Sequence, residues 1–457
     1  MIADELLREL RSLLGDRLST ANAVREHHSR GESHHEPSLP DAVAFPVATP
    51  EVSAIAALCT RARVPMTPFG AGSSLEGHVV PVRHGLTIDL SRMNRVLRVS
   101  ADDLDCTVEA GVTRKQLDKH LQSTGLFFPL DPGADATIGG MASTRASGTT
   151  AVRYGTMRET VLALTAVLAD GRVIHTGTRA RKSSAGYDLT RLLVGAEGTL
   201  GIITEVTLRL HGRPESIGAA TCWFDTIDEA VAAVITIVQL GIPVARIELL
   251  DDVQMDAINR FSHLSYPVAP TLFFEFHGLS TASVEEHAAA VAEIAAEHGA
   301  HGFSRAISPE ARAGMWQARH DAYYAALALR PGSRGWTTDV CVPISRLAEC
   351  IHETKADLAS SRLVGPLVGH VGDGNFHLVM PVHPEDPADL EEATRITDRL
   401  VERALSMGGT CSGEHGVGLG KMRFLEAEHG AAALDVMRAI KRALDPLDLM
   451  NPGKVLQ

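Results

Sequence analysis

The chain has 457 residues, which is too long for a single hydrophobic core and predicts at least two domains. Its formal net charge of −13, from 43 Lys and Arg against 56 Asp and Glu, comes without a long basic run and argues against nucleic acid as a partner. Six scattered cysteines form no C-x-x-C pair, and no apolar stretch approaches the ~20 residues that span a bilayer. These features predict reduced thiols in a cytoplasmic-type compartment and no transmembrane segment.

The N-terminal part of the chain leads into a first glycine loop. Residues 1–19 have the pattern of an amphipathic helix with acidic side chains, unlike a secretory signal or an acid-poor transit peptide. A polar segment rich in His and Ser, His27–Glu36, precedes a strand-helix-strand pattern in residues 40–70. The loop Gly70–Gly77 then resembles a dinucleotide fingerprint, with Asp89 near the expected place of a ribose-binding acid, but a strand-like segment with a proline follows instead of a helix. Such a loop can still hold phosphate on its N–H groups; a surface turn without function is the alternative.

Two further glycine-rich stretches follow. Residues Asp131–Gly155 interleave glycines with small and hydroxyl side chains, which indicates a backbone lying tightly against a bulky group. A long apolar strand, Val161–Ala169, comes next, with a hairpin at Asp170–Gly171. In Gly186–Leu210 the run Gly195–Gly198 separates a short helix from a strand.

The pattern changes beyond about Pro214. Periodicity predicts β-α-β-β-α-β between Trp223 and Phe303 and a second, partial copy between Thr337 and Met407. Strands that pair in this way form an antiparallel sheet with helices on one face, the ferredoxin-like arrangement. We therefore expect an α+β chain whose second part is a ferredoxin-like domain.

Two histidines, His370 and His377, lie seven residues apart in Gly369–Leu378, GHVGDGNFHL. On one straight strand an odd separation would place them on opposite faces. A bend at Gly372–Gly374 allows positive φ angles, so the two imidazoles can converge. Together with the carboxylate of Glu414 they would form the ligand set of a catalytic divalent metal (zinc, manganese or iron) with an open position. A pair of core histidines with ordinary hydrogen-bond partners is the alternative.

The order of the motifs resembles a known family. The chain contains PFGAGSSLEG, the DPG…TIGGM…RYG run, GAEGTLGIITE, W-x-x-R at Trp316–Arg319, GHVGDGNFH, SGEHG and a closing NPGK. Over nearly the whole chain this order resembles the FAD-dependent D-2-hydroxyacid dehydrogenases, in the flavoprotein superfamily of vanillyl-alcohol oxidase and para-cresol methylhydroxylase (PCMH). At Gly335–Leu347 and GHVGDGNFH the chain is most similar to the D-lactate dehydrogenases of the mitochondrial cytochrome-linked type.

The resemblance implies a domain organisation and a cofactor. Residues 1–214 are expected to form the N-terminal helix and a PCMH-type FAD-binding domain of two α+β subdomains. Residues 215–425 are expected to form the ferredoxin-like substrate domain with the metal site, and residues 426–457 to return to the FAD domain. We expect noncovalent FAD, because the first glycine loop has Ser73 and Ser74 where some members of the superfamily carry a tethering histidine or cysteine.

The residues expected to bind FAD lie in the glycine-rich stretches and in the closing NPGK. They are Pro68, Gly70, Ala71, Gly72, Ser73, Ser74, Gly77, His78, Pro132, Gly133, Thr137, Gly139, Gly140, Ser143, Gly148, Tyr154, Gly155, Glu197, Gly198, Ile203 and Asn451.

These groups suggest a mechanism. A metal on His370, His377 and Glu414 would hold the substrate carboxylate and 2-hydroxyl and make the hydroxyl more acidic. His415, next to the third ligand, is the expected base that takes the proton while the C2 hydride passes to the flavin.

Substrate recognition is expected on the helix after the first β-α-β-β-α-β unit. Arg319 suits a bidentate contact with a carboxylate, with Trp316 and Tyr323 as neighbours; a solvated helix arginine is the alternative. Relatives that act on D-2-hydroxyglutarate carry a lysine near the position of Thr337. Its absence favours D-lactate or another monocarboxylic D-2-hydroxy acid.

Several alternatives stay open. They are a D-2-hydroxyglutarate or glycolate dehydrogenase of the same family, a metal-independent flavin oxidase, a metal hydrolase, and a noncatalytic nucleotide- or metal-binding module. The electron acceptor could be cytochrome c, a quinone or an electron-transfer flavoprotein. The oligomeric state is open, a homodimer included. We expect a cytoplasmic protein, with peripheral membrane association left open.

Overall fold

The computed structural model describes residues 2–456, which divide into two compact units. Unit 1 comprises the residues up to Ser147, Gly155–Arg213, and the residues from Glu414 onward. Unit 2 comprises Gly148–Tyr154 and Pro214–Gly413. The chain thus changes unit four times along its length. The domain limits predicted after residues 214 and 425 stay a prediction.

The first part of unit 1 is a small, largely parallel sheet with the helices α1, α2 and α3 and one 3-10 turn. Its elements are α1 (Asp4–Leu14), η1 (Gly15–Arg17), β1 (Leu18–Ser19), α2 (Asn22–His27), β2 (Ala42–Ala44), α3 (Thr49–Ala62), β3 (Met66–Phe69) and β4 (Leu86–Asp89). The strand order is β1-β2-β4-β3, with β2 and β3 both parallel to β4. Parallel strands need a crossover connection, and α3 supplies it. The predicted strand-helix-strand pattern is therefore confirmed, and the apolar faces of α1 and α3 are buried with these strands.

The second part of unit 1 is an antiparallel sheet in the order β5-β6-β10-β8-β9. Its elements are β5 (Val96–Ser100), β6 (Asp105–Glu109), α4 (Arg114–Leu121), β7 (Leu126–Phe127), α5 (Ile138–Thr144), α7 (Met157–Thr160), β8 (Val161–Val167), β9 (Val173–His175), α8 (Leu189–Leu193), β10 (Ile202–Arg209) and β11 (His211–Gly212). β7 pairs with β11 apart from this sheet. Apolar side chains of α4, α5 and α8 are buried with those of β6, β8 and β10.

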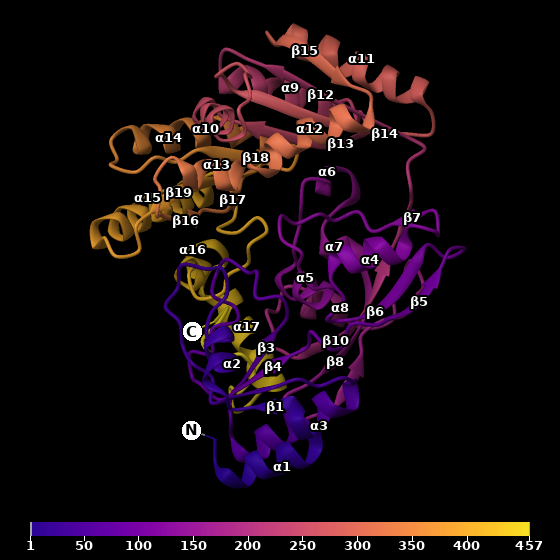
Figure 1. The fold of residues 1–457 in the computed structure, drawn as a ribbon, viewed down its shortest axis with the longest axis vertical. Coiled ribbons are helices and arrows are strands. Elements are labelled where there is room, and N and C mark those ends of the chain that lie inside the picture. The colour runs from indigo at the N-terminus through magenta and orange to yellow at the C-terminus, as the bar shows by residue number, and fades with distance from the viewer. Residues whose placement is uncertain (1, 457) are drawn as a thin grey trace. The chain divides into compact units, whose positions relative to one another are not determined.

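The C-terminal segment belongs to unit 1. It contains η3 (Met422–Phe424), α16 (Leu425–His429) and α17 (Ala431–Leu444). Beyond α17 the chain pairs with β3: the N–H of Met66 donates to the carbonyl of Leu449 at 2.7 Å, and the N–H of Asn451 donates to the carbonyl of Met66 at 2.7 Å. The yellow end of the chain accordingly lies beside β3 in Figure 1. The last residues are thus part of the sheet from which the first glycine loop leaves.

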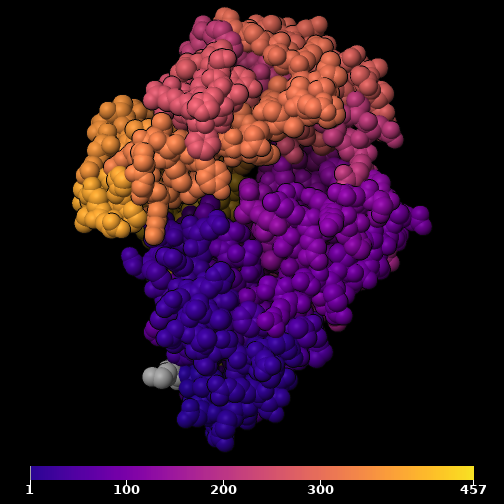
Figure 2. Space-filling model, viewed as in Figure 1, coloured from indigo at the N-terminus to yellow at the C-terminus, as the bar shows by residue number. Residues whose placement is uncertain are grey.

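Unit 2 is built on one antiparallel sheet, in the order β15-β12-β14-β13-β18-β19-β16, with β17 also paired to β19. Its elements are α6 (Ala151–Tyr154), β12 (Ser216–Trp223), α9 (Ile227–Gln239), β13 (Val244–Leu250), α10 (Asp252–Ser262), β14 (Thr271–Gly278), α11 (Thr281–Glu297), β15 (His301–Ala306), α12 (Pro309–His320), α13 (Ala322–Ala328), β16 (Arg334–Thr337), β17 (Val340–Cys341), η2 (Ile344–Arg346), α14 (Leu347–Ala359), β18 (Leu367–His370), β19 (Asn375–Val382) and α15 (Pro387–Ser406). The pair β13–β18 joins the two repeats into a single sheet. In Figure 2 the pink and orange atoms of unit 2 form one continuous body.

Helices lie on both faces of the unit 2 sheet, which differs from the expected single covered face. Side chains of α10, α12 and α13 pack on the face that carries Ala219, Leu250 and Phe273. A side chain at Gly218, whose neighbour Ala219 points to that face, would meet Val284 of α11 at 2.5 Å, so α11 covers the opposite face. The α+β fold class is confirmed. The helix α10, between two strands predicted to be consecutive, was missed.

Candidate active site

The first glycine loop follows directly after β3. A Cβ on Gly70 would lie 2.3 Å from the hydroxyl oxygen of Thr137, so only glycine fits there. Gly72 and Gly77 have φ angles of +70° and +75°, a conformation that side chains disfavour. The loop can therefore adopt this conformation only with glycines at these positions. This is expected of a phosphate-binding turn rather than of a regular strand.

The second glycine pair lies at the start of α5. The hydroxyl of Thr137 accepts a hydrogen bond from the N–H of Gly140 at 3.3 Å. The N–H of Gly139 donates to the carbonyl of Ala110 at 2.8 Å, and a Cβ on Gly139 would lie 2.5 Å from that of Ala110. Thr137 thus joins the two glycine-rich stretches, while Gly139 is also required by packing against the end of β6.

The third predicted stretch is joined to the first through Glu197. Its buried carboxylate accepts hydrogen bonds from the N–H groups of Val417 and Gly418 at 2.7 and 2.8 Å, and lies 3.2 Å from Nε2 of His78. The side-chain amide of Asn451 donates to the carbonyls of His78 and Glu197 at 3.0 and 2.7 Å. Three residues predicted to bind FAD therefore form one network with the chain that follows His415.

The residues around the loop fit a bound cofactor. Among the described residues, the buried Oγ of Ser74 and Nδ1 of His78 have no hydrogen-bond partner, and a polar ligand would satisfy them. Other predicted FAD residues lie elsewhere. Ile203 is part of the apolar core, Gly133 has open space around it, and the hydroxyl of Tyr154 lies 2.7 Å from Nδ1 of His277 in unit 2.

The histidines of the second predicted site lie on a hairpin of β18 and β19. In its register His370 is opposite Asn375 and Val368 is opposite His377, so both histidines point to one face of the sheet. Their ring centroids are 5.4 Å apart. The turn requires a positive φ only at Gly374, at +79°. The predicted convergence is correct, but it comes from the pairing register rather than from a bend with several left-handed residues.

Both imidazoles are held through Nδ1. Nδ1 of His370 lies 2.7 Å from Oε1 of Glu248 on β13, and Nδ1 of His377 lies 2.9 Å from the carbonyl oxygen of Thr338. Glu248 has no exposed surface. Burial by itself would raise its pKa, but the charges of His370 and Arg319 hold the pKa of Glu248 below its ordinary value. With Nδ1 engaged, Nε2 is the nitrogen that each ring would offer to a metal.

Arg319 lies in the last turn of α12, on the face of the sheet that carries Glu248. Its Nε and Nη2 are 2.9 and 2.7 Å from the same oxygen, Oε2 of Glu248. Trp316, one turn earlier, is buried against Phe273. Tyr323 on α13 is 38% exposed. The guanidinium is therefore fixed by a buried carboxylate, and the alternative of a solvated helix arginine does not hold.

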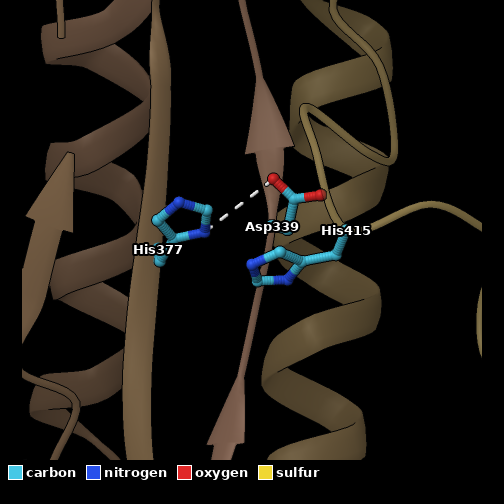
Figure 3. A group of neighbouring side chains, drawn as sticks. All are labelled: Asp339, His377 and His415. Atoms are coloured by element: carbon cyan, nitrogen blue, oxygen red, sulfur yellow. Dashed lines mark ion pairs between the residues drawn. The ribbon is translucent and has the colours of Figure 1, made fainter. Parts of the chain in front are cut away.

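Two overlapping groups of side chains could hold a metal. One is His370, His377 and Glu414, and the other is Asp339, His377 and His415; within each group the ligand atoms lie within 4.8 Å of one another. Figure 3 shows the second group, with the imidazole of His377 facing the carboxylate of Asp339. The first group is the one predicted from the sequence.

The carboxylate of Asp339 is already occupied. Its Oδ1 accepts from the side-chain amide of Asn375 at 2.9 Å, and its Oδ2 accepts from the hydroxyl of Ser412 at 2.8 Å. Asp339 thus holds Asn375 and Ser412, and each of its oxygens keeps a second lone pair. Neither Glu248 nor Asp339 was predicted. The signal for Glu248 was a charged residue inside the apolar strand ARIELL, where a carboxylate needs a partner.

Comparison with known proteins then decides the family. Residues 40–177 match the family described as "FAD binding domain", and residues 213–455 match "FAD linked oxidases, C-terminal domain". The chain belongs to the FAD-linked oxidases. This membership makes it an FAD-dependent oxidoreductase, and the predicted family is confirmed.

Several FAD-linked oxidases of known name are similar over the whole chain. The "Probable D-lactate dehydrogenase, mitochondrial" of Danio rerio is 53% identical, over 99% of this chain and 92% of the relative. The "D-lactate dehydrogenase [cytochrome], mitochondrial" of Arabidopsis thaliana is 46% identical, over 100% and 80%. The "Glycolate oxidase subunit GlcD" of Bacillus subtilis is 33% identical, over 100% and 97%.

Solved structures of the superfamily share the fold. p-Cresol methylhydroxylase with bound substrate matches with a TM-score of 0.81 at 17% identity, over 99% of this chain and 96% of its own. Alkyldihydroxyacetonephosphate synthase matches with a TM-score of 0.78 at 22% identity, over 98% and 86%. At these identities the likeness shows the fold alone, and the predicted PCMH-type architecture is confirmed.

The predicted cytoplasmic location was wrong. FAD-linked oxidases from Danio rerio, Arabidopsis thaliana, Saccharomyces cerevisiae and Kluyveromyces lactis that are 39–53% identical to this chain are named as mitochondrial proteins. Scattered thiols indicate a reducing environment at most, and that does not separate the two compartments. Among the described helices, none combines the length and the apolar composition needed to cross a membrane.

Proposed function

We propose that this FAD-linked oxidase oxidises D-lactate, or a related monocarboxylic D-2-hydroxy acid, to the 2-keto acid. Relatives that are 40–53% identical and named D-lactate dehydrogenase support the reaction. The main support for a metal site is that both imidazoles are in contact through Nδ1. Nδ1 of His370 contacts Glu248, and Nδ1 of His377 contacts the carbonyl of Thr338. This is the usual arrangement of histidines that bind a metal through Nε2.

In the proposed site, His370, His377 and Glu414 hold a divalent metal. Two histidines and a carboxylate suit zinc, manganese or iron(II). A bound metal would supply Lewis acidity that lowers the pKa of the substrate 2-hydroxyl. Asp339 keeps its bonds to Asn375 and Ser412 and orients the loop between β16 and β17.

His415 is the proposed base. It follows Glu414 directly, and its Nε2 lies 4.0 Å from Oε1 of that residue. A neutral imidazole there accepts the proton of the substrate hydroxyl as the bond from C2 to hydrogen breaks. Arg319 binds the substrate carboxylate through Nη1, the nitrogen that its contact with Glu248 does not use.

FAD, bound noncovalently, would supply the acceptor for the hydride. The residues proposed to hold it are those that the structure joins around the first glycine loop, with Thr137, Glu197 and Asn451 as its supports. Relatives named D-lactate dehydrogenase [cytochrome] support a cytochrome as the electron acceptor. A quinone or an electron-transfer flavoprotein is the alternative outcome of an acceptor assay.

Thr337 supports a substrate with one carboxylate. It ends β16 opposite Val379, at the position where relatives that use D-2-hydroxyglutarate are expected to carry a lysine. A second substrate carboxylate would have no cation from this position, and burying it unpaired is costly.

Anaerobic mixing of the purified protein with D- and L-2-hydroxy acids tests the proposal. We expect D-lactate to bleach the flavin absorbance, L-lactate to leave it unchanged, and prior treatment with a chelator to slow the bleaching. A flavin that no hydroxy acid reduces would refute the dehydrogenase. Reduction that is indifferent to chelator and to added metal would refute the metal alone.

A further inference from the structure

The polar segment rich in His and Ser covers the first glycine loop. The part of it from His28 to Ser38, which we name the strap, has no helix or strand. The N–H of Glu32 donates to the carbonyl of Gly72 at 3.1 Å. A Cβ on Gly31 would lie 2.7 Å from the same carbonyl oxygen and 3.3 Å from that of Ser74. The strap and the loop are therefore in backbone-to-backbone contact.

Both ends of the strap are fixed to unit 1. At its start, Nε2 of His28 lies 2.8 Å from Oδ2 of Asp89, at the end of β4, and the ring of His28 packs 4.5 Å from that of Phe69. At its end, the hydroxyl of Ser38 donates to the carbonyl of Pro81 at 2.8 Å, and its N–H donates to the carbonyl of Ser29 at 3.0 Å. The start of the strap thus contacts Phe69, directly before the glycine loop, and its end contacts Pro81, after the loop.

The contact between His28 and Asp89 is buried. Both side chains are buried, with 3% and 6% of their surface exposed. Nδ1 of His28 lies 2.8 Å from the carbonyl oxygen of Val24, and Oδ1 of Asp89 accepts from the N–H of Ser91 at 2.8 Å. Asp89 therefore uses both oxygens within the protein, which explains this acid without a ribose contact.

We propose that the strap is a structural part of the FAD site and that His28 is its positioning residue. The loop from Gly70 to Gly77 has no regular structure, and two of its glycines have positive φ angles, so its shape must be imposed from outside. The strap imposes it on folding, and FAD then binds a loop that is already ordered. If the strap is released, the glycine loop becomes ordered only when FAD binds. The entropy lost in that ordering then opposes FAD binding and weakens it.

Two adjacent histidines allow a matched test. His28→Asn removes the contact with Asp89, whereas His27→Asn changes an exposed neighbour. The rate of FAD release is measured on the purified holoenzymes by the fluorescence of free FAD after dilution. We expect His28→Asn to release FAD about tenfold faster or more, equivalent to about 1.4 kcal/mol, and His27→Asn to behave as the wild type. With excess FAD, the kcat of His28→Asn should return to near the wild-type value.

Equal FAD release from the wild type and a folded His28→Asn protein would overturn the proposal, and so would equal losses in both variants. If His28→Asn does not fold, Ser38→Ala, which removes only the hydroxyl bond to Pro81, is measured instead; unchanged release from it would also overturn the proposal. Flavin that no variant releases would contradict noncovalent attachment and not the strap. In that case the rate of proteolytic cleavage within residues 70–77 is measured. Faster cleavage in His28→Asn than in His27→Asn supports the proposal, and equal rates overturn it.

Discussion

Nδ1 of His370 lies 2.7 Å from Oε1 of Glu248, a carboxylate with no exposed surface. The other oxygen of Glu248 is in contact with Arg319. One buried side chain thus orients both a proposed metal ligand and the proposed partner of the substrate carboxylate. An isolated buried carboxylate is costly, so these two contacts also keep Glu248 ionised.

Replacing Glu248 should therefore weaken metal binding without removing a metal ligand. We expect Glu248→Gln to lose about 10- to 100-fold in metal affinity, the usual effect of removing a carboxylate behind a ligating histidine. Glu275→Gln is the matched control, since Glu275 is a buried acid on the neighbouring strand that contacts His277 at 2.8 Å. Metal content after dialysis against metal buffers measures both. Equal metal affinity in Glu248→Gln and the wild type would contradict the assignment.

The neighbours Glu414 and His415 should fail in different ways. Glu414→Ala should lose the metal, and with it substrate affinity. His415→Asn should keep FAD and metal but slow flavin reduction about 100-fold or more, the usual scale for losing a general base. Asp339→Asn should keep the metal, because the proposed carboxylate ligand is Glu414 and Asp339 is assigned to holding Asn375 and Ser412. Metal analysis and anaerobic stopped-flow reduction distinguish the variants. If His415→Asn lost the metal while Glu414→Ala kept it, the assigned roles of the two residues would be wrong.

The flavin should be released by acid. The first glycine loop presents Ser73 and Ser74, and neither side chain forms a stable bond to a flavin. Acid precipitation of the yellow protein should leave the flavin in the supernatant, measured by its absorbance. Colour that stays in the pellet after denaturation would show a covalent link.

Substrate preference should depend on the charge at position 337. We expect D-lactate to exceed D-2-hydroxyglutarate by about tenfold or more in kcat/KM, because a second carboxylate would be buried without a cation. Thr337→Lys should narrow or reverse this ratio, whereas Thr337→Met should not. Steady-state kinetics with both acids measures the effect. A wild-type enzyme equally efficient on both would refute the prediction.

The closing NPGK motif should make stability depend on pH. Lys454 is buried, with Nζ 2.6 Å from the carbonyl of Val80, and burial lowers its pKa to about 8. Between pH 8 and the ordinary lysine value near 10.4 the unfolded chain holds a proton that the folded chain has lost, so stability rises with pH, by up to about 3 kcal/mol. Below pH 8 this contribution is constant.

Lys454→Met should lack this rise. The difference is measured by denaturant unfolding of both proteins with excess FAD, at several pH values from about 7 to 10. The release of flavin reports the unfolding. The same pH dependence in both proteins would show that Lys454 is not the group responsible.

Local patterns predicted much of the fold, and the missed parts depend on distant pairing. The amphipathic first helix, the crossover helix α3 and most strands of unit 2 follow from periodicity. The helix α10 had its own signal, Asp251, whose side chain accepts from the N–H of Gln254, but the two flanking strands were read as consecutive. That Gly148–Tyr154 belongs to unit 2 has no local signal, because these seven residues lie within a glycine-rich run of unit 1.

In the candidate site, too, some residues could be predicted from local motifs and others could not. The histidine pair and Glu414 could be found from motifs, since each is flanked by glycines. Glu248 could not, because its role depends on the pairing of β13 with β18, which lie about 120 residues apart in the chain. Asp339 likewise needs the position of Asn375 on β19 to be understood.

The four changes of unit along the chain set an order of events during translation. Unit 2 lacks nothing once Gly413 has left the ribosome, but unit 1 needs the residues from Glu414 onward, including those that pair with β3. The unit that is started first is therefore completed last, although domains usually fold in the order of synthesis. A nascent chain stalled shortly before Leu449 should hold a finished unit 2 and an FAD-binding unit that chaperones still have to keep from aggregating.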